Sequence, residues 1–163
     1  MKLMHPVGLI SAALFMAVAC GSTGSSASAP PASPSEHAMM HHVALDVASS
    51  RFGEVLVDGQ GRVLYLFAAD TTSSSTCFDA CATAWPPLIT DKGATVDAMH
   101  MATAALTGTT PRKDGSVQVT YNGHPLYYFK GDTQPGQITC QAVVNFGAAW
   151  YVVDAHGNAI TKS

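Results

Sequence analysis

The chain has 163 residues, of which 12% are charged, and its formal net charge is -3. This length leaves room for one compact domain with a modest core once terminal segments are set aside. The charge balance excludes a basic nucleic-acid-binding surface and a polyacidic tail, so we expect no nucleic-acid partner. Abundant Gly, Ser, Thr, Ala and Pro residues are typical of a small exported β protein.

The N-terminus has the features of an export signal. Lys2 supplies a positive charge, and residues 7–19 form a mostly apolar run that is too short for a permanent membrane-spanning helix. The run ends in small residues directly before Cys20, which resembles a bacterial lipobox, although Ala17 stands where leucine is usual. We predict a signal peptide over residues 1–19, lipidation of Cys20, and an extracytoplasmic protein anchored to the cell membrane or outer membrane. The alternative is ordinary secretion with cleavage at the same point and a free cysteine.

Residues 20–42 are predicted to link the anchor to the folded domain. Nearly all of residues 21–36 are Gly, Ser, Thr, Ala or Pro, which cannot bury an apolar core and predict a disordered tether. A cluster of imidazole and thioether side chains follows, made of His37, Met39, Met40, His41 and His42. Thioethers favour Cu(I) and imidazole suits Cu(II) or Zn(II), so the cluster is a candidate copper site. The alternative is a polar junction that binds metal only adventitiously. Met99-His100-Met101 is a second group of this kind.

Residues 43–163 are predicted to form the folded domain as a series of β-hairpins. We expect strands at residues 53–58, 62–67, 85–90, 116–121, 124–129 and 150–154. The strongest turn signal is Asn122-Gly123, which is typical of a two-residue type I′ turn. A short helix is expected within residues 96–106, and residues 112–114 are predicted to lie in a solvated loop.

The chain contains the same pattern twice. Residues 65–70 (Tyr-Leu-Phe-Ala-Ala-Asp) return as residues 127–132 (Tyr-Tyr-Phe-Lys-Gly-Asp), 62 positions later (127 − 65). Other pairs keep this spacing to within three residues: Cys77 and Cys140, Trp85 and Trp150, Gly93 and Gly157. The spacing indicates a duplicated unit, with repeat one at about 52–95 and repeat two at about 115–160. We therefore predict an all-β fold of mainly antiparallel hairpins with one or two short helices. Its two tandem repeats would form one pseudo-twofold β-sandwich or barrel-like domain.

The motifs of both repeats resemble those of one protein family. In repeat one they are residues 64–71, 77–81 and 85–88, and in repeat two residues 112–115, 118–123 and 125–129. Together they resemble a family of bacterial secreted-repeat lipoproteins with a Tyr-x-(Phe/Trp/Tyr)-x-x-Asp motif and no assigned function. The similarity covers roughly residues 52–157. It implies an exported, usually lipid-anchored domain and brings no catalytic residues.

The six motif residues are Tyr65, Phe67 and Asp70, and Tyr127, Phe129 and Asp132. Within each copy the aromatic side chains point to one face of a strand, while leucine and tyrosine side chains at the alternate positions point to the other. Both faces are apolar, so we predict central strands that are buried on both sides. The aspartates follow the strands, where a carboxylate can accept backbone N–H groups and fix a turn. The alternative is that the two aspartates converge across the pseudo-twofold axis as a metal or acid/base pair.

Three cysteines remain besides Cys20, and an oxidising compartment should pair two of them. Cys77 and Cys81 are four residues apart, which one helical turn brings within disulfide distance, and both belong to the family pattern. We expect them to pair and Cys140 to stay buried and reduced. Pairing of Cys140 with either of the others would join the repeats, and a redox dithiol or thiolate metal site is the functional alternative.

No phosphate-binding loop, nucleophile elbow or zinc-protease helix is present in the sequence. We expect a non-catalytic extracytoplasmic lipoprotein, a binding or envelope-accessory module whose partners are the membrane and a further envelope component, with no required cofactor. The alternative is a copper-handling or redox-accessory protein that uses the His/Met cluster and the cysteines. A third hypothesis is an enzyme that uses Asp70 and Asp132.

Overall fold

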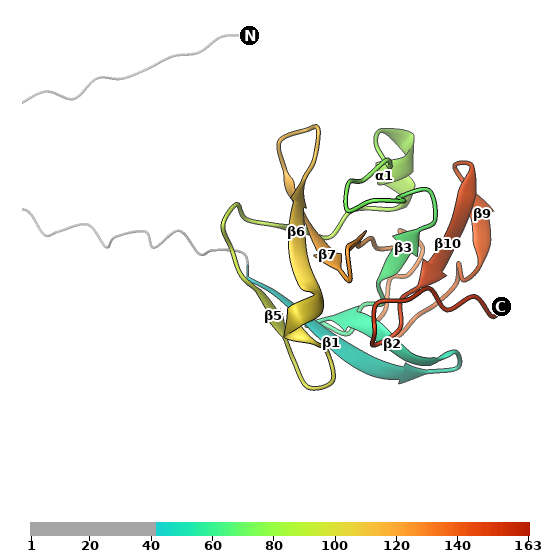
Figure 1. The fold of residues 1–163 in the computed structure, drawn as a ribbon. Coiled ribbons are helices and arrows are strands. Elements are labelled where there is room, and N and C mark those ends of the chain that lie inside the picture. The colour runs from blue at the N-terminus through green and yellow to red at the C-terminus, as the bar shows by residue number, and fades with distance from the viewer. Residues whose placement is uncertain (1–41) are drawn as a thin grey trace, which may run out of the picture. The chain divides into compact units, whose positions relative to one another are not determined.

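A computed structural model describes residues 42–163 of the chain, and its ribbon is shown in Figure 1. The predicted all-β class is confirmed: within residues 42–163 most ordered elements are strands, and helix is limited to two short segments. The strands are β1 (Val43–Ser50), β2 (Gly53–Asp58), β3 (Tyr65–Phe67), β4 (Ile89–Thr90), β5 (Val96–Ala98), β6 (Thr107–Pro111), β7 (Val117–Tyr121), β8 (His124–Pro125), β9 (Val143–Asn145) and β10 (Ala148–Val152). The helical segments are α1 (Ala80–Ala84) and the 3-10 turn η1 (Ala104–Leu106).

In the described part of the chain, the strands form three small sheets. Their orders are β2-β1-β5, β3-β10-β9 and β4-β7-β6, with β8 paired to β7. All pairings are antiparallel except that of β5 with β1, which is parallel. Figure 1 shows the β1–β2 hairpin at the bottom of the domain, the β6–β7 hairpin on the left and the β9–β10 hairpin on the right, with β3 between β7 and β10. Across residues 42–163 the sheets do not close into a barrel.

The Asn122-Gly123 turn has the predicted geometry. Tyr121 pairs with His124 across it, and Asn122 and Gly123 have φ of 48° and 77°. Positive φ at both central residues is what a type I′ turn requires, and glycine and asparagine tolerate it best. The hairpin register is therefore fixed by local sequence.

Several elements differ from the sequence prediction. Residues 85–90 contribute only the two-residue β4, because Pro86 and Pro87 lack the N–H groups that a strand ladder needs. Residues 96–98 form β5 beside β1 where a helix was expected, and that prediction was wrong for this part of residues 96–106. Only η1 at the end of that stretch is helical.

The motif strands separate two apolar clusters, as the two-sided pattern predicted. Tyr65, Phe67 and Tyr127 lie in one cluster, and Leu64, Leu66 and Leu126 lie in the other. In the first cluster the equivalent tryptophans stack on each other, with ring centroids 4.0 Å apart and an interplanar angle of 5°. Each tryptophan also meets the motif tyrosine of its own repeat edge-on, at 5.3 Å for Trp85–Tyr65 and 5.2 Å for Trp150–Tyr127. These matched contacts show the pseudo-twofold relation between the repeats.

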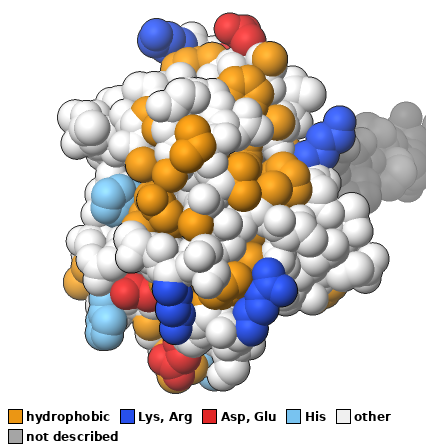
Figure 2. Space-filling view, turned by 90° about the vertical axis from the view of Figure 1, so that its right-hand side faces the viewer, with side chains coloured by type: hydrophobic (Ala, Val, Ile, Leu, Met, Phe, Trp, Pro, Cys, Tyr) orange, Lys and Arg blue, Asp and Glu red, His pale blue; other side chains and the backbone are white. Residues whose placement is uncertain are grey.

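The repeats differ after the equivalent positions Cys77 and Cys140. Repeat one continues into α1, whereas repeat two forms the β9–β10 hairpin. Asn145 in this hairpin accepts a hydrogen bond from Trp150 Nε1, while the equivalent Trp85 Nε1 has no partner among the described residues. The hairpin exposes Val144 (73%) and Phe146 (44%), and Figure 2 shows hydrophobic side chains gathered on the side of the domain that β9 and β10 occupy. Exposed apolar side chains are common on protein surfaces, so this face alone identifies no partner.

Candidate functional site

The two motif tyrosines meet at the pseudo-twofold axis. Tyr65 N donates to Tyr127 O at 2.8 Å, and Tyr127 N donates to Tyr65 O at 2.9 Å. Such a reciprocal pair places both side chains on the same face of an antiparallel ladder. The Tyr65 and Tyr127 side chains therefore lie next to each other, each beside the other repeat.

The tyrosine hydroxyls bind the motif aspartates of the opposite repeat. Tyr65 donates to Asp132 Oδ2 at 2.5 Å, and Tyr127 donates to Asp70 Oδ2 at 2.6 Å. All four side chains are buried, with the aspartates no more than 5% exposed. The motif residues thus form two crossed Tyr–Asp pairs that join repeat one to repeat two.

The second oxygen of each aspartate holds the loop that follows it. Asp70 Oδ1 accepts hydrogen bonds from Thr76 N at 2.7 Å and Thr76 Oγ1 at 2.6 Å. Asp132 Oδ1 accepts them from Thr139 N at 3.0 Å and Thr139 Oγ1 at 2.6 Å. This is the turn-fixing role favoured by the sequence, and the bond to the opposite tyrosine is an addition that the sequence did not predict.

Burial raises the pKa of Tyr65 and of Tyr127 far above the ordinary range, and the adjacent carboxylates raise it further. A hydroxyl with such a raised pKa stays protonated, and its O–H donates a hydrogen bond to the carboxylate. Each carboxylate receives three donors from the protein itself. The arrangement suits a structural joint better than an acid/base or metal-binding pair.

A buried arginine, Arg112, supports one of the two pairs. Its Nη1 donates to Ser75 Oγ at 2.9 Å and to Gln118 Oε1 at 2.5 Å, and its Nη2 donates to the carbonyl of Cys77 at 2.8 Å. Ser75 Oγ in turn lies 2.7 Å from the Tyr127 hydroxyl. The prediction of a solvated loop was wrong for Arg112, which is 6% exposed, because two of its three acceptors, Ser75 Oγ and the Cys77 carbonyl, lie 37 and 35 residues earlier in the chain.

The predicted Cys77–Cys81 disulfide is present, with a Cα–Cα distance of 5.3 Å, and it ties α1 to the loop before it. Cys140 is a free thiol, as expected, but it is only partly buried. Burial raises the pKa of the Cys140 thiol, and the Asp132 carboxylate adds to the shift. A raised pKa disfavours the reactive thiolate form.

Opening the disulfide is expected to lower the free energy of unfolding by about 2 kcal/mol, the chain-entropy value for so short a loop. The check is urea unfolding of the protein with and without a thiol reductant. A variant carrying Cys77→Ser and Cys81→Ser is the matched control, and its urea midpoint should not respond to the reductant. Equal sensitivity of the parent and this variant would contradict the prediction.

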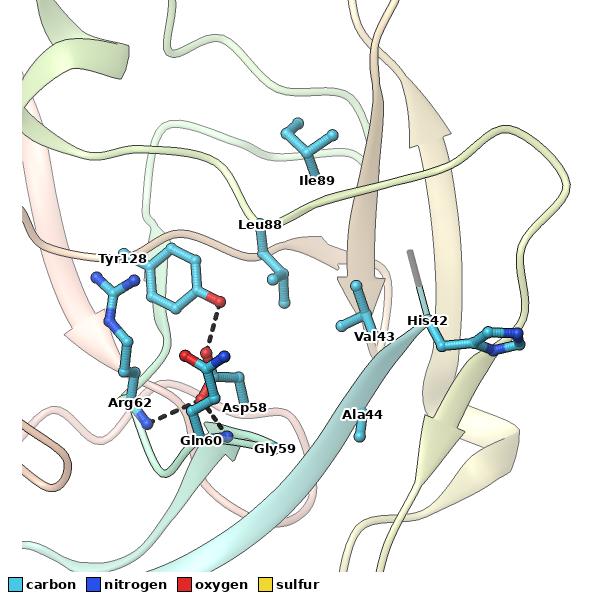
Figure 3. A pocket seen from close by; sticks show the side chains of 10 residues that line it. All are labelled: His42, Val43, Ala44, Asp58, Gly59, Gln60, Arg62, Leu88, Ile89 and Tyr128. Carbon is cyan, nitrogen blue, oxygen red and sulfur yellow. Dashed lines mark hydrogen bonds between the residues drawn. The ribbon is translucent and has the colours of Figure 1, made fainter. Parts of the chain in front are cut away.

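A separate polar pocket of about 260 Å³ lies between the start of β1, the β2–β3 turn and β4 (Figure 3). Its lining residues are His42, Val43, Ala44, Asp58, Gly59, Gln60, Arg62, Leu88, Ile89 and Tyr128. Polar groups gather on the wall formed by the β2–β3 turn and Tyr128, and Val43, Leu88 and Ile89 form the apolar wall. His42 stands at the rim with its imidazole directed away from that polar wall.

Asp58 organises the polar wall. Its Oδ1 accepts hydrogen bonds from Gln60 N and Arg62 N, both at 2.9 Å, and its Oδ2 accepts one from the Tyr128 hydroxyl at 2.7 Å. Burial raises the pKa of Tyr128, and its bond to Asp58 raises it further. The Arg62 guanidinium lies over the Tyr128 ring, 3.9 Å from the ring centroid. Sequence reasoning missed this site, since Asp58 and Tyr128 are 70 residues apart and no local motif relates them.

The predicted copper cluster falls mostly outside the described residues, which begin at His42. This boundary also leaves out the predicted signal peptide, Cys20, His37, Met39, Met40 and His41. His42 lies directly before β1, with Nδ1 3.9 Å from Asp97 Oδ2. From His42 onward, no group of three or more His, Cys, Asp or Glu side chains is arranged to hold a metal ion. In the same part of the chain no helix is long and apolar enough to cross a membrane.

The crossed Tyr–Asp pairs and the matched aromatic contacts define the class of protein: a duplicated β domain whose repeats interlock through their shared motif. A family model described as a secreted repeat of unknown function matches residues 47–89 and 108–154, which is more than half of the chain. The chain belongs to this family of secreted repeats, as the sequence resemblance implied. Membership indicates an extracytoplasmic protein. A search of curated proteins and a search of solved structures found no match.

Proposed function

We propose that this protein is a non-catalytic binding module of the cell envelope, anchored through a lipid on Cys20. Its ligand would be a small molecule that carries an anionic group on an apolar body. Family membership supports the extracytoplasmic setting, and the sequence before Cys20 supports the anchor. The observation that carries the binding function is Arg62, which lines the pocket and whose guanidinium is stacked on the ring of Tyr128, another lining residue.

The residues around Arg62 hold its guanidinium in a fixed orientation that suits an anion. The Tyr128 ring supports the guanidinium, and the bond from Tyr128 to Asp58 fixes that ring. Within residues 42–163 the guanidinium forms no ion pair with a carboxylate. A planar guanidinium with free N–H groups matches a carboxylate or phosphate in two parallel hydrogen bonds.

The other residues that line the pocket determine which anion would fit. Asp58 is negative, but its oxygens already accept three hydrogen bonds, from Gln60 N, Arg62 N and the Tyr128 hydroxyl, which leaves them less available to a ligand. Leu88 and Ile89 form an apolar wall, and a small-molecule site typically combines such a wall with a few placed polar groups. A short amphipathic anion therefore fits better than a cation or a neutral sugar.

The test compares hexanoate with hexylammonium, which share an apolar chain and differ in charge, by NMR titration of the isotope-labelled protein. Hexanoate should shift the amide signals of Gly59, Gln60 and Arg62, and hexylammonium should not. Arg62→Gln should weaken hexanoate binding by about tenfold or more, because a charge-assisted hydrogen bond contributes about 1.5–3 kcal/mol.

Arg51→Gln is the matched control, since Arg51 also lies over an aromatic ring, that of Phe52, and is not part of this pocket. It should leave hexanoate binding unchanged. Equal binding of both probes, or equal binding by the parent and Arg62→Gln, would reject the pocket as an anion site.

A further inference from the structure

A tight turn follows β5 at Met99–Ala102, where Ala102 N donates to Met99 O at 2.8 Å. Met99 N also donates to Leu45 O at 2.8 Å, which ties the turn to β1. Because β5 runs parallel to β1, the turn lies beside Asp46, the residue after Leu45. None of the turn residues lines the pocket that contains Arg62.

Asp46 fixes the imidazole of His100. Its Oδ2 lies 2.8 Å from His100 Nδ1, and its Oδ1 accepts a hydrogen bond from Val47 N at 2.8 Å. In a neutral imidazole one nitrogen donates and the other accepts, so a proton on Nδ1 toward the carboxylate leaves the Nε2 lone pair free. The His100 side chain is 71% exposed. Metal-binding histidines are oriented by a carboxylate in this way.

The backbone of His100 is in an unusual conformation. Its φ is +42°, in the left-handed region, at the second position of the turn. Glycine is the usual residue where such a turn needs positive φ, and outliers of this kind collect at functional sites. The fold thus holds a histidine where glycine would fit with less strain.

Met99 and Met101 flank His100 and are 41% and 50% exposed. Methionine is usually buried, yet here the residues directly before and after His100 in the chain are both exposed methionines. Both side chains have three rotatable bonds and can adapt to a common centre.

We propose that Met99, His100 and Met101 form a Cu(I) site with two thioether ligands and one imidazole ligand, and that Asp46 is a positioning residue for the imidazole. Thioethers are soft ligands that select Cu(I), and a set of three neutral ligands suits a monovalent ion. Zn(II) and Cu(II) favour additional nitrogen, thiolate or carboxylate ligands. No such group of three His, Cys, Asp or Glu side chains is arranged for a metal in the described part of the chain.

His42 offers an internal comparison. It faces Asp97 across the same pair of strands, but the Nδ1–Oδ2 distance of 3.9 Å exceeds hydrogen-bond length, so the carboxylate does not fix this ring. The turn at His100 therefore has an orienting contact that His42 lacks.

The test follows the methyl carbons of ¹³C-labelled methionines by NMR as Cu(I) is added to the full chain without oxygen, after alkylation of its free thiols. One equivalent should shift the Met99 and Met101 methyl signals, and the same amount of Zn(II) should leave them in place. Met99→Leu with Met101→Leu keeps size and exposure, so it should fold normally. Competition with a chromogenic Cu(I) chelator should show an affinity for this site at least a hundredfold weaker in that variant.

Two more variants distinguish copper binding at the turn from copper binding at the N-terminal cluster. Met39→Leu with Met40→Leu should leave the Met99 and Met101 shifts unchanged, because Met39 and Met40 belong to that cluster. Asp46→Ala should weaken Cu(I) binding by about tenfold and change the His100 tautomer seen by ¹⁵N NMR, with Asp46→Asn in between. Unmoved Met99 and Met101 signals, or full affinity in the Met99→Leu and Met101→Leu variant, would overturn the proposal.

Discussion

Replacing Asp70 or Asp132 with alanine is expected to lower the free energy of unfolding by roughly 3–5 kcal/mol. Each change removes the acceptor of three buried or partly buried donors: the tyrosine hydroxyl of the other repeat, and the threonine N–H and hydroxyl of the following loop. An unsatisfied buried donor costs about 1–3 kcal/mol, and three are left at once. Because small domains unfold at a total cost of about 5–15 kcal/mol, the double variant should not fold at room temperature. Urea unfolding followed by circular dichroism measures both effects.

The control for this result is Asp97→Ala. Asp97 is an exposed carboxylate whose contact with His42 is 3.9 Å long, so its loss should change stability by no more than about 0.5 kcal/mol. A comparable loss in this variant would mean that the effect does not come from the buried bonds.

A double-mutant cycle tests whether the bonds cross between repeats. Tyr65→Phe combined with Asp132→Ala should show a coupling energy of about 1–3 kcal/mol, since the two side chains are in direct contact. Tyr65→Phe combined with Asp70→Ala should be closer to additive, because Asp70 bonds Tyr127 instead. Stronger coupling within a repeat than between repeats would contradict the crossed arrangement.

Local patterns in the sequence were enough to predict much of the fold. The alternation around Tyr65 and Tyr127 placed both faces of the motif strands in apolar surroundings, and Asn122-Gly123 specified its own turn. The Cys77–Cys81 disulfide could be predicted because the two residues are only four positions apart in the sequence. Each of these features depends on residues that are close in sequence.

The partners of the polar side chains were not predictable in this way. The duplication showed that Tyr65 and Asp132 occupy equivalent motifs, but not that they bond, since no spacing encodes which repeat supplies the acceptor. Arg112 looked like part of a solvated loop because its acceptors lie elsewhere in the chain. The same applies to the parallel pairing of β5 with β1, which brings His100 to Asp46 across 54 positions.

Alkaline pH is expected to destabilise the domain steeply above about pH 10. Burial raises the pKa of Tyr65, Tyr127 and Tyr128, and the carboxylate bonded to each hydroxyl raises it further. In the unfolded chain these tyrosines ionise near pH 10, so above that pH the unfolded state binds fewer protons than the folded state. Stability from this source is complete below pH 10 and falls as pH rises, by about 1.4 kcal/mol per pH unit for each tyrosine.

For three tyrosines the free energy of unfolding falls by up to about 4 kcal/mol per pH unit. A rise of two pH units should therefore lower it by about 8 kcal/mol and unfold the domain. The measurement is the urea midpoint as a function of pH, with tyrosinate absorbance recorded beside circular dichroism. A variant carrying Tyr65→Phe and Tyr127→Phe starts from lower stability, but its slope should fall to about one third, because only Tyr128 remains. The prediction would fail if the pH dependence of stability were unchanged in this variant. It would also fail if these tyrosines ionised while the circular dichroism signal of the β structure persisted, because folding would then not keep their hydroxyls protonated.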